Sequence, residues 1–187
     1  MQNKISPRFL FISLAILAAG LWRVFVSGGI ISFSNFTPVG AMALFGGAYF
    51  SNKRLAFLFP LLTLWLSDII IDSFIYGHGL VLFYSGWYIS YAAFALMVVM
   101  GIAIKKPTVS NITLFGTLGS FMHWVITNFG VWAQGSMYPK TGLGLMQCYT
   151  LALPFLSNSI VSTLVFSAAL FGSFELAKRR FPILALA

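Results

Sequence analysis

The chain has 187 residues, of which 59% are hydrophobic and only 7% are charged. Soluble domains carry roughly 25% charged residues, so this composition excludes a soluble globular protein. The net charge of +8 would suit a nucleic acid, but the cations sit where short loops between apolar runs orient a membrane protein, so we expect no nucleic-acid partner.

Six apolar runs follow one another along the chain and predict six transmembrane helices. They cover residues 8–26, 37–50, 55–75, 80–104, 111–132 and 148–176. A crossing needs about 20 residues, and the run at 37–50 is shorter than that. A thinned bilayer, a tilted neighbour or a helix start buried in protein would each explain the short run. The sequence therefore predicts an all-α integral membrane protein, with residues 1–187 forming a single transmembrane domain, a six-helix bundle.

Nine of the eleven cations fall at alternate ends of the predicted helices. They are Lys4, Arg8, Lys53, Arg54, Lys105, Lys106, Lys178, Arg179 and Arg180. Because short cationic loops stay on the cytoplasmic side, the pattern predicts a multi-pass protein of the bacterial cytoplasmic (inner) membrane with both termini in the cytoplasm. These cations are also suited to contact anionic lipid.

A cleaved signal peptide is an alternative interpretation of residues 1–22, since Lys4 and Arg8 precede an apolar stretch that ends in small residues. Its removal would leave the C-terminal cations on the outer side. The alternation of charge therefore favours a retained first helix.

Polar side chains gather in the connections and helix halves that this topology places outside. Asp68 and Asp72 lie one turn apart, His123 lies near mid-depth of the fifth helix, and Asn128 lies in its outer half. An ionisable group in hydrocarbon costs at least about 2.5 kcal/mol, so such groups normally face the bundle interior or a wet cavity. Trp124, Asn128 and Trp132 recur every fourth residue and share one helix face. This face is expected to line a cavity open to the outside.

Simpler roles remain open for the same residues. Arg23 and Asp68 would neutralise each other between helices, and His123 would serve as an interhelical hydrogen-bond partner. Asn128 would stabilise helix packing, and Trp132 would belong to an aromatic belt at the membrane interface. No ATP-binding, zinc-protease or serine-hydrolase motif occurs in the sequence. The spacing of the His and Asp residues does not indicate a metal site, so we expect no metal and no cofactor.

Two resemblances emerge from local segments. "SNFTPVGAMALFGGAYF", "LWLSDIIID" and "NFGVWAQGSMYPKTGLGLMQCYTLALPF" are similar to an uncharacterised family of small bacterial membrane proteins. The six helices, the cytoplasmic termini and the outward polar cavity resemble the substrate-capture subunits (S components) of energy-coupling-factor vitamin transporters. Ala15 and Ala19 resemble the small-residue face by which those subunits dock onto a coupling subunit.

The second resemblance implies a substrate-binding membrane subunit of an importer for a small, vitamin-like molecule. Its partners would be a coupling transmembrane subunit and ATPases, and the chain itself would not be an enzyme. The pocket or lid residues that this resemblance implies are Asn35, Asp68, His78, His123, Asn128, Trp132, Tyr138 and Lys140. The main alternative is a structural or accessory subunit of a larger membrane complex. A further alternative is an intramembrane enzyme that uses Asp68 and His123.

Overall fold

The computed structural model describes residues 6–27 and 36–185, and every regular element in these ranges is a helix. The elements in chain order are α1 (Pro7–Phe25), α2 (Val39–Tyr49), α3 (Lys53–Ile70) with its π-helical extension η2 (Ile71–Ile75), α4 (Trp87–Ala103), α5 (Val109–Gln134), α6 (Gly142–Leu151), α7 (Leu153–Arg180) and the 3-10 turn η3 (Pro182–Ala185). Within these residues, three helices are long and apolar enough to cross a membrane: Pro7–Phe25, Lys53–Ile75 and Leu153–Arg180.

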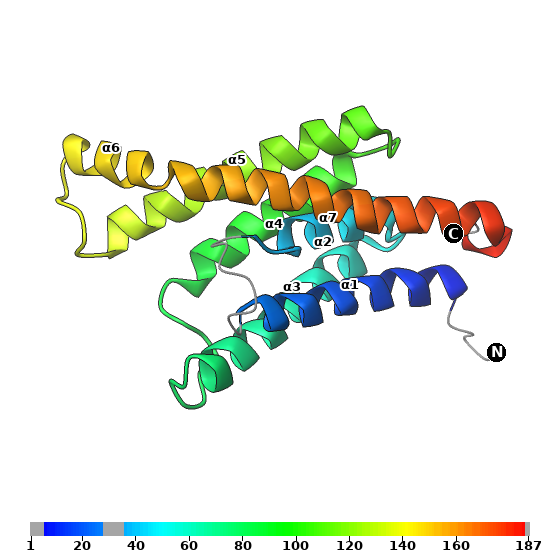
Figure 1. Ribbon diagram of the computed structural model, residues 1–187, viewed down its shortest axis with the longest axis horizontal. Helices are drawn as coiled ribbons and strands as arrows, with labels where there is room; N and C mark the ends of the chain where they lie inside the picture. Colours follow the sequence, from blue (N-terminus) through cyan, green and yellow to red (C-terminus); the bar gives the residue numbers. More distant parts are fainter. Residues whose placement is uncertain (1–5, 28–35, 186–187) are drawn as a thin grey trace.

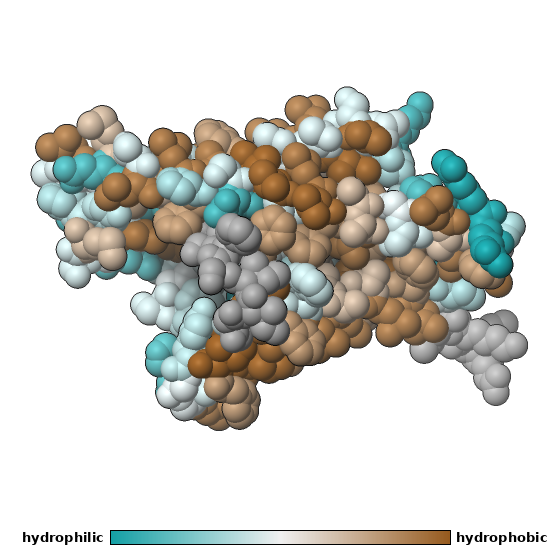
Figure 2. All heavy atoms as spheres, in the orientation of Figure 1, coloured by the Kyte–Doolittle hydropathy of each residue, from teal (hydrophilic) through white to brown (hydrophobic). Residues whose placement is uncertain are grey.

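The ends of the helices are arranged so that cationic segments meet at one end of the molecule. In Figure 1, α1 begins and α7 finishes at the same end of the long axis. Arg8, in the first turn of α1, donates to the carbonyl oxygens of Tyr49 at 3.0 Å and Ala185 at 3.5 Å. On the face shown in Figure 2, hydrophobic residues cover most of the middle of the molecule and the most hydrophilic atoms gather toward its ends.

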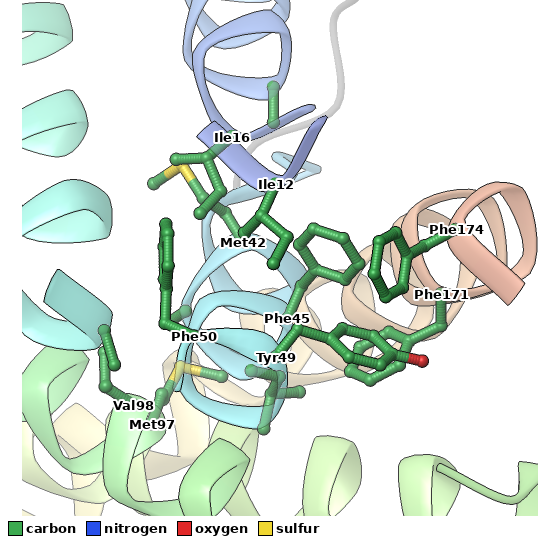
Figure 3. Close-up of a cluster of buried hydrophobic side chains, with 14 of the residues drawn as sticks. Ile12, Ile16, Met42, Phe45, Tyr49, Phe50, Met97, Val98, Phe171 and Phe174 are labelled. Atoms are coloured by element: carbon green, nitrogen blue, oxygen red, sulfur yellow. The ribbon is translucent and has the colours of Figure 1, made fainter. Parts of the chain in front are cut away.

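The short helix α2 forms the centre of the fold and contacts α1, α3, α4, α5 and α7. Ten of its eleven residues are buried, so its surroundings are protein rather than lipid. Of the three explanations for the short apolar run at 37–50, this burial supports a helix start that is buried in protein, because α2 is enclosed by its neighbours. Figure 3 shows the rings of Phe45 and Tyr49 from α2 packed against Phe171 and Phe174 from α7.

Glycines allow α2 and α4 to approach each other closely. A Cβ atom at Gly47 would overlap the carbonyl oxygen of Val98, and a Cβ atom at Gly101 would overlap that of Leu44. Each glycine therefore faces backbone of the other helix, which cannot move aside as a flexible side chain would.

The observed boundaries differ from the predicted ones in two places. The run 80–104 becomes helical only at Trp87, because Gly77, Gly79 and Gly86 adopt positive φ angles of 70°, 77° and 78°, and residues 76–86 form an irregular connection. The predicted run 148–176 is divided at Ala152, and the first of the two helices, α6, already begins at Gly142, six residues before the predicted start. Pro154 favours the division, since proline has no backbone N–H and is favoured in the first turn of a helix, although Pro60 lies inside α3 without ending it.

Candidate functional site

A cavity of about 190 Å³ lies inside the bundle, and its wall is formed by α1, α2, α3, α4, α5, α7 and the connection before α4. The polar side chains that line it are Arg23, Thr37, Asp68, Tyr84, Ser90, His123, Thr127, Asn128, Ser159, Ser162 and Thr163. An apolar bundle gains nothing by gathering so many polar groups unless they pair with one another or with a bound molecule.

The most polar part of the wall is an ion pair between α1 and α3. Arg23 Nη2 lies 2.6 Å from Asp68 Oδ1, and Arg23 Nη1 lies 2.5 Å from Ser67 Oγ. The Tyr91 hydroxyl donates to the second oxygen of Asp68 at 2.7 Å. Both carboxylate oxygens are thus occupied, and the pair adds no net charge to the cavity.

The opposite wall is formed by α5. The imidazole of His123 packs against the Phe94 ring, with 4.5 Å between centroids, and its Nε2 is buried with no hydrogen-bond partner in the described part of the chain. Asn128 Nδ2 donates to the Trp124 carbonyl oxygen at 2.8 Å within the same helix. His123, Trp124 and Asn128 all line the cavity, although His123 and Asn128 are not on the same helix face.

The cavity adjoins a second, larger hollow toward the connections at 84–86 and 134–137. This hollow has a volume of about 460 Å³, and it shares Tyr84, Ser90 and Thr127 with the first cavity. Tyr84 belongs to the irregular connection before α4, and its burial raises the pKa of its hydroxyl above the usual value. Tyr84 thus lines both hollows where they adjoin.

Three residues of the predicted site line the cavity together: Asp68, His123 and Asn128. Asn35 lies outside the described residues. His78 is exposed between Gly77 and Gly79, so the structure does not place it at the cavity.

Three further residues of the predicted site do not line the cavity either: Trp132 lies in the last turn of α5, and Tyr138 and Lys140 lie in the connection that follows it. Trp132 Nε1 donates to the Pro139 carbonyl oxygen at 2.9 Å. The ammonium group of Lys140 donates to the carbonyl oxygens of Trp132 and Gly135 and therefore caps the end of α5. The predicted lid is a folded connection with its own internal hydrogen bonds.

The small-residue face of α1 is turned toward the protein's own core. Ala19 is buried, with 7% of its surface exposed, and Ala15 packs partly buried against the same core. The exposed face of α1 carries Leu14, Leu17 and Leu21 instead. Ala15 and Ala19 are therefore not available as the docking face expected from the sequence.

Several cavity residues escaped the sequence-based prediction of the site. Arg23 was expected only to neutralise Asp68. Asp68 and His123 were identified because an ionisable group in hydrocarbon is costly. This reasoning does not apply to Ser90, Thr127 and Ser159, whose side chains are not ionisable. The structure brings them together because α4, α5 and α7 pack side by side.

The fold and the cavity define an all-helical protein with helices suited to a membrane and a buried polar cavity at its centre. The chain belongs to a family of unknown function (DUF6580), which it matches over residues 3–184. This match agrees with the expected resemblance to an uncharacterised family. No curated protein and no solved structure matches the chain. No group of three or more His, Cys, Asp or Glu side chains suited to a metal ion occurs among residues 6–27 and 36–185.

Proposed function

We propose that this protein captures a small molecule in its central cavity and is the substrate-binding membrane subunit of an importer. The observation that carries the proposal is the unfilled volume of about 190 Å³ with polar walls in an otherwise apolar bundle. Ligand sites typically combine mostly apolar walls with a few placed polar groups. Here Arg23, His123 and Asn128 supply the polar groups, and Phe94, Met97 and Phe155 supply apolar wall.

The proposal includes six crossings, formed by α1 to α5 and α7, with both termini in the cytoplasm of a bacterial cell and the protein in its cytoplasmic membrane. The cationic segments at Lys53–Arg54, Lys105–Lys106 and Lys178–Arg180 support this orientation. The second hollow lies near the connections at 84–86 and 134–137, which this orientation places outside. A ligand would reach the central cavity from there, past Tyr84.

Transport would require a coupling subunit and ATPases, as in the energy-coupling-factor transporters that the architecture resembles. A coupling subunit would dock on an exposed apolar helix face. On α1 this face is formed by Leu14, Leu17 and Leu21. The chain itself would bind the vitamin-like cargo without changing it chemically.

The test is native mass spectrometry of the protein purified in lipid nanodiscs. We expect a small-molecule adduct on the wild-type protein and on His78→Ala, because His78 lies outside the cavity. Ser159→Leu places a larger apolar side chain in the cavity wall and should remove the adduct. An adduct that persists in Ser159→Leu would place the ligand elsewhere. Absence of any adduct, together with stable co-purification of other membrane subunits, would favour the accessory-subunit alternative.

A further inference from the structure

The charges in the wall of the central cavity cancel each other. Among the described residues that line it, Arg23 and Asp68 are the acid and the strong base, and they form the ion pair at 2.6 Å. The two oxygens of Asp68 accept from Arg23 and Tyr91, and Arg23 also contacts Ser67 Oγ at 2.5 Å. Residues 28–35 contain no Lys, Arg, Asp, Glu or His. The cavity therefore offers no unpaired countercharge to a ligand.

His123 does not change this balance. Its imidazole packs against the Phe94 ring, and the ion pairs of the described residues do not include it. A buried charge without a partner is costly, so the uncharged imidazole suits these surroundings. The same cost applies to a ligand, because an ion that enters the cavity loses its hydration and gains no opposite charge.

The polar side chains of α5 present acceptors to the cavity. Asn128 Nδ2 donates to the Trp124 carbonyl oxygen at 2.8 Å, and since only the amide nitrogen can donate, this bond identifies the other atom as Oδ1. In the part of the chain that the structure describes, Oδ1 accepts no hydrogen bond and is not among the unpaired atoms that are fully buried. The Thr127 hydroxyl donates to the His123 carbonyl oxygen at 2.9 Å, which leaves its oxygen free to accept.

From the charge balance and these acceptors we propose that the cavity binds an uncharged molecule that donates hydrogen bonds through N–H or O–H groups. Phe94, Trp124 and Phe155 line the same cavity, so the body of the ligand is apolar or aromatic. A cavity of about 150 Å³ holds benzene, so a volume of about 190 Å³ accommodates one ring with a small polar group. This inference rests on the proposed capture function and specifies the chemical class of the ligand.

Four probes of nearly the same shape separate charge from hydrogen bonding. Benzamide is neutral and donates through its NH₂ group, benzoate is an anion and benzamidinium is a cation at neutral pH. Acetophenone is neutral and carries a methyl group in place of the NH₂ group. Binding of each is measured by calorimetry and by thermal unfolding of the protein in nanodiscs.

We expect benzamide to bind at least about a hundredfold more tightly than either ion, because an unpaired buried charge is far more costly than a neutral amide. We expect it to bind about fivefold more tightly than acetophenone, which cannot donate to Asn128. An ion that binds as tightly as benzamide, acetophenone that binds as tightly, or no binding of benzamide would overturn the inference.

A charge placed in the wall should change the preferred probe. Ser90 lines both the cavity and the adjoining hollow, so Ser90→Asp adds an unpaired negative charge there and should shift the preference from benzamide to benzamidinium. Ser90→Asn has nearly the same shape without the charge and should keep the preference for benzamide. Thermal unfolding shows that both variants are folded. A folded Ser90→Asp protein that still prefers benzamide would contradict the argument from charge balance.

Asn128→Leu removes the acceptor and keeps a side chain of similar size. Benzamide should then bind about as weakly as acetophenone, while the affinity for acetophenone stays unchanged. A purely structural effect would weaken both probes equally and would remove Asn128 from the site. If native mass spectrometry identifies a charged adduct, the inference fails and the capture function stands. If it finds no adduct and none of the four probes binds, the capture function fails as well.

Discussion

Arg23 on α1 and Asp68 on α3 form an ion pair with 2.6 Å between Nη2 and Oδ1, and they do so at the wall of a cavity rather than in a packed core. Only 7% of the Asp68 side chain and 18% of the Arg23 side chain are exposed. The pair therefore has two consequences. It joins two helices, and it keeps one side of the cavity polar.

Removing one partner of this pair should cost much more stability than removing both. Asp68→Asn leaves the Arg23 charge buried and unpaired, and we expect a loss of about 3–5 kcal/mol. The double variant Arg23→Met with Asp68→Leu replaces both charges with apolar groups and should recover most of this loss. Unfolding in detergent micelles measures both. A double variant no more stable than Asp68→Asn would contradict this account of the pair.

The close approach of α2 and α4 should make Gly47 and Gly101 intolerant of any side chain. Gly47→Ala and Gly101→Ala each place a methyl group against backbone, and we expect a loss of about 1–3 kcal/mol from overpacking. Gly172→Ala is the matched control, because nothing lies within 4 Å of the added carbon. Alanine favours a helix by about 0.5–1 kcal/mol over glycine, so the control should be neutral or more stable. Equal melting temperatures for the three variants would contradict the packing argument.

The junction between α6 and α7 should loosen when its side-chain hydrogen bond is removed. Trp124 Nε1 donates to the Ala152 carbonyl oxygen at 2.9 Å, and Trp124→Phe deletes this bond at a cost of about 1 kcal/mol. Hydrogen exchange should accelerate across residues 142–153. The control Trp65→Phe deletes a similar bond, from Nε1 to the Leu82 carbonyl oxygen at 3.0 Å, and should leave exchange in α6 unchanged. Faster exchange in α6 in both variants would mean that the effect is not local.

Cysteine labelling tests the proposed orientation directly. The chain has one cysteine, and this residue, Cys148, is buried, so background labelling should be low. Met137→Cys and Leu80→Cys place thiols in exposed connections and should react with a membrane-impermeant maleimide in intact spheroplasts. Ser51→Cys and Lys105→Cys should react only after permeabilisation. Labelling of Lys105→Cys in intact spheroplasts would overturn the six-crossing orientation.

The helical class and most of the helix positions could be predicted because apolar runs of sufficient length have few alternatives in a membrane protein. The prediction at residues 80–86 was wrong because an apolar run that ends in glycine has the same composition in a helix and in an irregular connection. The division at Ala152 was not predicted. A proline such as Pro154 does not by itself show whether the helix breaks, because here the break also depends on α6 folding back against α5. Tyr149 shows this fold-back, since its hydroxyl donates to the Val125 carbonyl oxygen at 2.8 Å.

The site was only partly predictable for a related reason. Asp68 and His123 were identifiable because ionisable groups are costly in hydrocarbon and must face something polar. Trp132 shares a helix face with Asn128, but it lies near the end of α5. There its indole N–H donates to the Pro139 carbonyl oxygen, and its own carbonyl oxygen accepts from Lys140, so both groups hold the connection after α5. Helical spacing therefore predicts a shared face and does not predict which neighbour covers it.

The length of α2 sets the depth of the cavity. A helix of eleven residues rises only about 16 Å at 1.5 Å per residue, roughly half the hydrocarbon thickness of a bilayer. The surrounding helices are longer, and the first turn of α2 lines the cavity through Val39 and Gly40. Adding or deleting one turn at this position would shift the first turn of α2, and with it this part of the cavity wall, by about 5.4 Å.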